Sequence, residues 1–189
     1  MTKRNDILAA TKELFWLRGY EATSPREIQN LSGAGQGSFY HHFRSKRDLA
    51  SEAMREVVEE RLRDFDRDLS GPGSIRERIG RFLDQPKDSL RGCRIGRMVW
   101  DAAVEDAKIR EPLHRYFHHV EERLISELKQ SVDQGQVKLL LPTEQVALLI
   151  VTSLQGGFTL SRATGTDRMA DLLGSLRSLL DVVILEQVK

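Results

Sequence analysis

The chain has 189 residues, of which 40% are hydrophobic and 30% charged, a composition typical of a folded globular protein. Its 29 Lys and Arg against 28 Asp and Glu leave a net charge of +1, so the overall charge identifies no partner. The single cysteine excludes an intrachain disulfide and cysteine-cluster metal motifs, which suits a reducing compartment.

Two features of the sequence bear on the cellular location of the protein: its N-terminal residues and its longest apolar run. Met1 to Asp6 are polar and an amphipathic pattern follows at once, so we expect no signal peptide. The longest apolar run, Val146–Leu154, is shorter than the ~20 residues that a membrane span needs. We therefore expect a cytoplasmic protein with no membrane partner.

Hydrophobic periodicity of a helical kind runs through almost the whole sequence and predicts an all-α protein with about nine helices. Alternation of the strand type is hard to find, so we expect no strand. The first helix carries Ile7, Leu8, Leu14 and Phe15 on one face and ends at Gly19.

Three further helices are predicted before residue 70. Ser24–Glu27 supplies an N-cap, a proline at the first helical position and a capping box for a helix that breaks near Gly33–Gly35. A second short helix is expected from about Gln36 to His42. Ser45–Asp48 offers a similar cap for a long helix that reaches Leu69.

The clearest linker in the chain is the Gly- and Pro-containing segment 70–73. Five helices are expected after it: from a Ser74 cap to near Pro86, from about Cys93 to Asp106, from Leu113 to Gly135, from a Thr143 cap through the apolar Val146–Leu154, and from Met169 to Val183.

The first 50 residues are the basic part of the chain. They hold eight basic and five acidic side chains, a net charge of +3, whereas the remainder carries −2. A basic head on a near-neutral body is compatible with nucleic-acid binding by the head. A chance fluctuation of a few charges would give the same difference.

Residues 24–43 are predicted to form two short helices joined by a glycine-containing turn, with a helix on either side. This is the arrangement of a helix-turn-helix motif, whose second helix enters the DNA major groove. Gln36, Gly37 and Ser38 are small or carry an amide, so the backbone can approach the bases and Gln36 can contact adenine.

The side chains that follow suit contacts with phosphate. Tyr40, His41 and His42 can donate to phosphate oxygens from the second turn of this helix. Lys46 adds a cation beside the free N–H groups that begin the next helix, an arrangement that binds phosphate. Phe39 and Phe43 would face inward. Spacing alone leaves open a helical protein with surface histidines and no DNA partner.

A set of short motifs in residues 7–49 carries a family resemblance: Phe15, Gly19-Tyr20, Thr23-Ser24, Arg26-Glu27-Ile28, Gly37-Ser38-Phe39-Tyr40-His41-His42-Phe43 and Ser45-Lys46. This stretch is similar to the DNA-binding domain of the TetR family of transcriptional regulators. The resemblance implies a homodimeric repressor that binds a palindromic operator and that a small-molecule inducer releases. It implies a DNA-binding domain over residues 1–50 and a ligand-binding and dimerisation domain over 51–189.

Carried over by position, the resemblance implies that Ser24 and Arg26 contact the DNA backbone or a flanking base. It assigns base reading and phosphate contacts to the residues named above: Gln36, Gly37, Ser38, Tyr40, His41, His42 and Lys46. The family's turn usually reads Gly-Val-Ser, whereas this one reads Gly33-Ala34-Gly35. Losing the capping serine costs roughly a few tenths of a kcal/mol.

The C-terminal half resembles the family more loosely, and this resemblance implies that the last two predicted helices, about 143–187, form the dimer interface. Val146–Leu154 is apolar on all sides, and a helix of this kind must bury against something on each side. Gly156-Gly157 would permit a close approach of two backbones. The alternative is a core helix within a monomer.

Cys93 lies at a predicted helix N-terminus between Arg91 and Arg94, surroundings that favour a reactive thiolate. The segment from Gly92 to Leu113 resembles a branch of the family in which a cysteine senses electrophiles or oxidants. A lone cysteine is otherwise a small buried hydrophobic residue.

A ligand pocket, or a plain core, is expected where the apolar sides of the C-terminal helices meet. Its candidate residues are Phe82, Cys93, Met98, Trp100, Tyr116, Phe117 and Phe158.

Two other classes of function remain as alternatives. An enzyme would have to use Cys93 or the row His114, His118 and Glu122, which has metal-ligand spacing but no fourth ligand. No catalytic motif is present, so we expect no enzyme, no cofactor and no metal site. A dimeric adaptor would bind protein through its basic head, and its affinity would lack the steep salt dependence of DNA binding.

Overall fold

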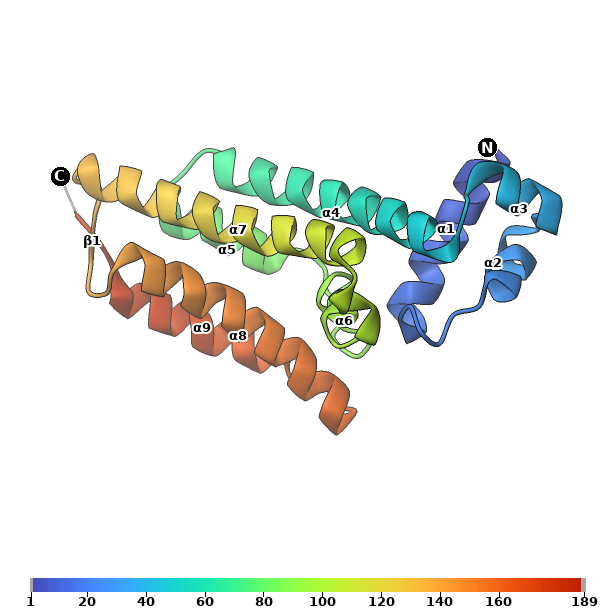
Figure 1. The fold of residues 1–189 in the computed structure, drawn as a ribbon. Coiled ribbons are helices and arrows are strands. Elements are labelled where there is room, and N and C mark those ends of the chain that lie inside the picture. Colours follow the sequence, from blue (N-terminus) through green and yellow to red (C-terminus); the bar gives the residue numbers. More distant parts are fainter. Residues whose placement is uncertain (1, 188–189) are drawn as a thin grey trace. The chain divides into compact units, whose positions relative to one another are not determined.

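The structure is a computed structural model that describes residues 2–187. These residues form nine α-helices, one 3-10 helix and two short strands (Figure 1). The elements are α1 (Lys3–Arg18), α2 (Pro25–Ser32), α3 (Gln36–His42), α4 (Lys46–Ser70), α5 (Ile75–Asp84), α6 (Gly96–Val99), η1 (Ala102–Glu105), α7 (Ala107–Asp133), β1 (Val137–Leu139), α8 (Thr143–Thr164), α9 (Met169–Val183) and β2 (Ile184–Glu186).

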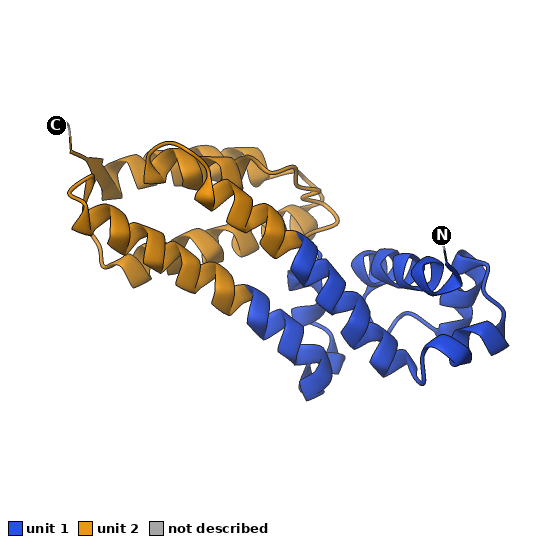
Figure 2. Ribbon diagram, turned by 90° about the horizontal axis from the view of Figure 1, so that it is seen from above, with its two compact units in different colours: residues 1–60, 93–116 blue, residues 61–92, 117–189 orange. Residues whose placement is uncertain are grey.

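The chain divides into two compact units, shown in different colours in Figure 2. The first unit contains the residues up to Glu60 together with Cys93–Tyr116. The second contains Arg61–Gly92 together with the residues from Phe117 onward. Each of the long helices α4 and α7 therefore contributes to both units, and the first unit is built from two separate stretches of sequence.

The core of the first unit is formed by α1, α2, α3 and the beginning of α4. Phe39 and Phe43 face inward as predicted, with side chains that are 0% and 3% exposed. Gly19 ends α1 with a φ of +86°, in the left-handed region that favours glycine. The core residues are Ile7, Leu8, Ala10, Leu14, Ile28, Ala34, Phe39, Phe43, Leu49 and Ala53.

In the second unit, α8 and α9 run side by side and α5 packs against α9. A Cβ at Gly157 would collide with Leu172 and lie within 3.2 Å of Met169, so the glycine allows α8 to approach α9 closely. Helix α8 is long and apolar enough to span a membrane by length and composition alone. Core helices of soluble proteins pass the same test, and α8 buries one side of its surface here.

The expected helix from Cys93 to Asp106 is wrong. Only α6 and η1 form there, and they are four residues each. Asp101 interrupts the helix with an extended backbone and accepts the N–H of Ala103 on its carboxylate, which begins η1. Cys93 therefore precedes α6, where its Sγ accepts the N–H of Gly96 at 3.2 Å.

Helix α7 begins at Ala107, several residues before the predicted start at Leu113, and contains Pro112. Proline cannot donate to the carbonyl four residues earlier, which belongs to Lys108. The Ser51 hydroxyl donates to that carbonyl at 3.0 Å instead. A partner on α4 thus satisfies the group that the proline leaves open, and the helix continues through it.

The two strands were not predicted. Strands β1 and β2 pair antiparallel with Leu139 opposite Ile184, and each is only three residues long, which is too short to show an alternating pattern. The expected cap at Thr143 is also wrong. Pro142 occupies the N-cap position of α8, and the Thr143 hydroxyl donates to the side chain of Glu144.

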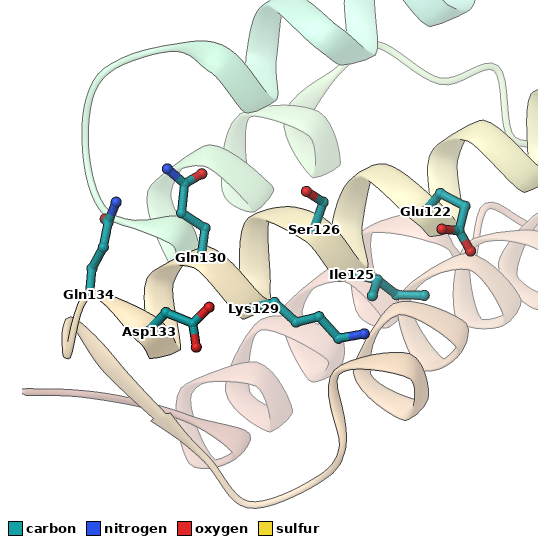
Figure 3. Close-up of a pocket in the computed structure, with 7 residues that line it drawn as sticks. All are labelled: Glu122, Ile125, Ser126, Lys129, Gln130, Asp133 and Gln134. Atoms are coloured by element: carbon teal, nitrogen blue, oxygen red, sulfur yellow. The ribbon is translucent and has the colours of Figure 1, made fainter.

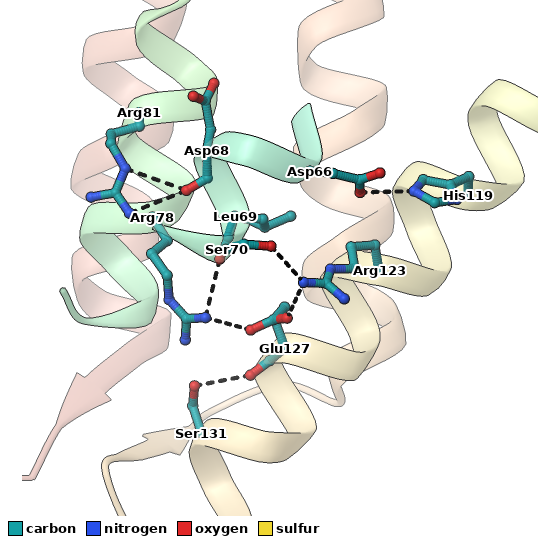
Figure 4. Close-up of polar contacts among 10 residues, drawn as sticks. All are labelled: Asp66, Asp68, Leu69, Ser70, Arg78, Arg81, His119, Arg123, Glu127 and Ser131. Atoms are coloured by element: carbon teal, nitrogen blue, oxygen red, sulfur yellow. Dashed lines mark hydrogen bonds and ion pairs between the residues drawn. The ribbon is translucent and has the colours of Figure 1, made fainter. Parts of the chain in front are cut away.

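A buried carboxylate ties three helices of the second unit together (Figure 4). The Glu127 side chain on α7 is 7% exposed and forms ion pairs with Arg78 on α5 and with Arg123, the latter at 2.8 Å. Arg78 also donates to the carbonyl of Leu69, and Arg123 to the hydroxyl of Ser70, at the end of α4. Glu127 therefore pairs with two guanidinium groups that also donate to polar groups at the end of α4.

We expect Glu127→Gln to lower the free energy of unfolding by about 3 kcal/mol, because it leaves two arginines without their buried counter-charge. Urea unfolding followed by circular dichroism measures the change. Glu122→Gln, the same substitution at an exposed position of α7, serves as the control and should be nearly neutral. Equal stability of the two variants would show that the network contributes no stability.

Candidate DNA-binding surface

Helix α3 presents one face to solvent and one to the core. Gln36, Gly37, Tyr40 and His41 are exposed, whereas Ser38 and His42 are half-buried. The inward face is anchored by Phe39 and Phe43, as described above. The predicted contact residues of α3 are therefore accessible, and the burial of two phenylalanines holds the helix in position.

The beginning of α3 is open. Gly35 is the N-cap, with a φ of −68° and no side-chain cap hydrogen bond, as its lack of a side chain requires. A Cβ placed on Gly35 or on Gly37 would meet nothing within 4 Å. The first turn of the helix consequently offers its backbone to a partner with little side-chain cover.

The beginning of α2 is closed by a complete capping box, as predicted. Ser24 Oγ accepts the N–H of Glu27 at 3.2 Å, and the Glu27 carboxylate accepts the N–H of Ser24 at 2.8 Å. The hydrogen bonds from Ser24, together with the nearby Arg18, hold the pKa of Glu27 below its usual value. Arg26, the other predicted contact on α2, is exposed.

Lys46 lies at the first position of α4 and is half-buried. Its Nζ lies 3.9 Å from the centroid of the Tyr20 ring, in the connection between α1 and α2. Burial lowers the pKa of Lys46, while the carboxylates of Glu21, Asp101 and Glu27 act in the opposite direction. Lys46 thus has an aromatic partner that the sequence analysis did not anticipate.

Asp101 is the residue of this surface that sequence reasoning missed. Its Oδ2 accepts the N–H groups of Tyr20 at 2.6 Å and Glu21 at 3.1 Å. The same oxygen lies 2.7 Å from where a Cβ on Gly19 would be, so only glycine fits there. Asp101 therefore holds the connection between α1 and α2.

The residues predicted to line a ligand pocket divide between the two units. Cys93, Met98, Trp100 and Tyr116 belong to the first, whereas Phe82, Phe117 and Phe158 belong to the second. Of these residues, Met98 and Phe82 are buried and four others are half-buried. Trp100 is 80% exposed, so its expected place on a buried face is wrong.

Two hollows in the second unit lie elsewhere. One, of about 580 Å³, lies along α7 and is lined by polar side chains with Ile125 among them (Figure 3). The other, of about 140 Å³, lies between α5 and α9. None of the seven predicted pocket residues lines either hollow.

The histidines of α7 form no metal centre in the part of the chain described. Among residues 2–187, no three His, Cys, Asp or Glu side chains are grouped so that they could hold a metal ion. His119 pairs instead with Asp66 of α4, with 2.9 Å between Nε2 and Oδ1. His114 and His118 are exposed on α7.

Two short helices joined by a tight turn, with the second exposed and anchored by aromatic residues, define a helix-turn-helix transcriptional regulator. Residues 7–53 match the family model of bacterial regulatory proteins of the tetR family. Residues 71–174 match the model of the tetracyclin repressor-like C-terminal domain. The protein belongs to the TetR family, binds DNA through its N-terminal domain, and is a regulator rather than an enzyme.

Curated relatives agree with this assignment over most of the chain. The regulator YxaF of Bacillus subtilis is 28% identical over 186 residues, which cover 92% of this chain and 93% of YxaF. LmrA of the same organism is 26% identical over 84% of this chain and 85% of its own. The regulator QacR of Staphylococcus aureus is 41% identical over 54 residues, 29% of each chain.

Solved structures agree in fold. The reduced form of Escherichia coli NemR superposes over 100% of both chains with a TM-score of 0.84 at 19% identity. A TetR-family regulator from Agrobacterium tumefaciens has a TM-score of 0.84 at 20% identity, over 96% of this chain and 97% of its own. The all-α architecture with an N-terminal helix-turn-helix is therefore shared throughout.

We expect Ser24→Ala to lower the free energy of unfolding by about 1 kcal/mol, because it removes the cap of α2. Ser74→Ala is the matched control, since Ser74 forms the same capping box with Glu77 at the start of α5. Both variants should lose similar stability by thermal unfolding. Only Ser24→Ala should weaken DNA binding, and an equal loss in Ser74→Ala would attribute the effect to stability alone.

Proposed function

We propose that the protein binds a palindromic operator as a homodimer and represses transcription until a small molecule or a thiol-reactive compound releases it. The observation that carries this proposal is the exposed face of α3, set on two buried phenylalanines. On this face Gln36, Gly37 and Ser38 would read bases. Tyr40, His41, His42 and Lys46 would contact phosphates, and Ser24 and Arg26 the backbone or a flanking base.

Selection from random DNA duplexes at near-physiological salt tests the DNA-binding part. The parent protein should enrich an inverted repeat with half-sites about one helical turn apart, because a two-fold dimer presents two copies of α3. Gln36→Ala should change the preferred base at one position of each half-site, at a cost of about 1–3 kcal/mol. Lys46→Ala should weaken binding to all sequences. It should also reduce the magnitude of the slope of log affinity against log salt concentration, the salt slope, by about one.

Lys129→Ala, an exposed change on α7 in the second unit, is the control for loss of a positive charge. It should leave both the selected sequence and the salt slope unchanged. An unchanged selected sequence for Gln36→Ala would show that α3 does not read bases in this way.

The proposed dimer interface uses α8 and α9. Large apolar side chains stay exposed on these helices in the single chain: Leu148 is 52% exposed, Leu160 57%, Leu179 42% and Val182 59%. Exposed apolar groups of this kind mark surfaces that associate. A second copy of the same two helices would cover them and complete a four-helix bundle.

We expect the double substitution Leu148→Glu with Val182→Glu to convert the dimer into monomers, because four charges would enter the apolar interface. Sedimentation velocity measures the molar mass. Leu90→Glu, a change at an exposed leucine of the same unit outside these helices, should leave the dimer intact. A dimer that survives the double substitution would place the interface elsewhere.

The proposed thiol signal acts at Cys93. The residue is half-buried, and the N–H of Gly96 donates to its Sγ just before α6. N-ethylmaleimide, which adds covalently to a single thiol, should release the parent protein from its selected duplex but leave Cys93→Ser bound. Release of both would remove the thiol from the mechanism and leave a non-covalent inducer.

The site of action we propose is the bacterial cytoplasm, where operator DNA is accessible. The packing of α8 against α9 supports this location, because it buries one apolar side of α8, and the proposed dimer would cover the exposed Leu148 and Leu160 without a membrane.

A further inference from the structure

Lys46 meets an aromatic ring that is itself fixed in place. The Lys46 Nζ lies 3.9 Å from the centroid of the Tyr20 ring, well within the range of a cation–π interaction. The Tyr20 ring also packs edge-on against Phe15, with 5.7 Å between ring centroids. Phe15 is 2% exposed and belongs to the buried face of α1. The ring face offered to Lys46 is therefore set by the core.

The backbone that carries Tyr20 is fixed as well. Asp101 Oδ2 accepts the N–H groups of Tyr20 and Glu21, as described above. The carbonyl of Tyr20 accepts the N–H of Thr23 at 3.1 Å, and the Thr23 hydroxyl donates to the carbonyl of Gly19 at 2.7 Å. These hydrogen bonds restrain the conformation of the turn as long as the Asp101 carboxylate remains in place.

We propose that Tyr20 positions Lys46 for its phosphate contact and that Asp101 holds Tyr20 in place for this purpose. Both are positioning residues, which act on DNA affinity without contacting DNA. The inference rests on the proposed phosphate contact of Lys46. It assigns a role in DNA binding to a residue that lies 81 positions beyond Tyr20 in the sequence.

The physical reason is the cost of ordering a long side chain. A lysine that is free in solution loses rotamer freedom when it binds a phosphate, whereas a lysine already held on a ring loses less, so binding is tighter. The ammonium group has three N–H donors, and a ring face engages one side of it. Burial lowers the pKa of Lys46, and the nearby carboxylates of Glu21 and Asp101 oppose this shift.

The test compares Tyr20→Phe and Tyr20→Leu in the full-length protein, with Lys46 present and in a Lys46→Ala background. Affinity is measured by fluorescence anisotropy over a range of salt concentrations. The probes are the labelled duplex selected by the parent and a random duplex of equal length. Thermal unfolding of each variant separates loss of folding from loss of binding.

We expect Tyr20→Phe to bind like the parent, because it keeps the ring face. Tyr20→Leu should bind both duplexes about three- to tenfold more weakly, the size of effect that a partly exposed cation–π contact produces. Its salt slope should fall toward that of Lys46→Ala. In the Lys46→Ala background, Tyr20→Leu should have no further effect, because the side chain it positions is absent.

Asp101→Ala should give a smaller loss of the same kind, and this loss should also vanish in the Lys46→Ala background. Trp100→Ala is its control, because it changes the neighbouring exposed side chain and keeps the carboxylate. This pair keeps the proposal testable if Tyr20→Leu does not fold.

Parental affinity in both Tyr20→Leu and Asp101→Ala would overturn the inference. An equal loss with and without Lys46 would do the same, since Tyr20 would then act through the fold. These two outcomes leave the proposed DNA contacts intact. A folded parent protein that binds neither duplex would instead overturn the DNA contacts themselves, and this inference with them.

Discussion

The burial of two phenylalanines holds in place the seven-residue helix that we propose for DNA recognition. A helix as short as α3 has no stability of its own in water, because the free energy needed to nucleate a helix exceeds what two turns of hydrogen bonds contribute. Phe39 and Phe43 supply the missing stability by filling the core of the first unit. Their burial also decides which face of α3 stays outside, so the exposure of Gln36, Gly37 and Tyr40 follows from the packing of their neighbours.

Charged and polar side chains satisfy the polar atoms that apolar packing leaves without partners. Asp101 accepts two backbone N–H groups of the connection between α1 and α2, and Ser51 completes the carbonyl that Pro112 leaves open in α7. In the second unit Glu127 forms ion pairs with Arg78 and Arg123, which donate to polar groups at the end of α4. Asp101 and Ser51 thus satisfy backbone groups directly, whereas Glu127 acts through the two arginines.

Much of the first unit could be predicted from the sequence because its signals are local. Ser24 and Glu27 are three residues apart, and the inward pair Phe39 and Phe43 are four apart, so the helices that they define follow from the nearest neighbours. The interruption by Asp101 could not be predicted in this way. Its carboxylate has partners 80 and 81 residues earlier, and the apolar residues around it fit a helical pattern equally well. The strands β1 and β2 could not be predicted because three residues are too few to show the alternation of apolar and polar residues that marks a strand.

The discontinuity of the first unit has a consequence for engineered chimeras. A chimera could join the DNA-binding domain of one regulator to the C-terminal domain of another, with the junction placed in α4. A head cut from residues 1–60 of this chain would carry Tyr20 and Glu21 but leave behind Asp101, the acceptor for their N–H groups. A transferable DNA-binding domain would therefore have to include residues 93–116, or be joined to a C-terminal domain that supplies a carboxylate at the same place.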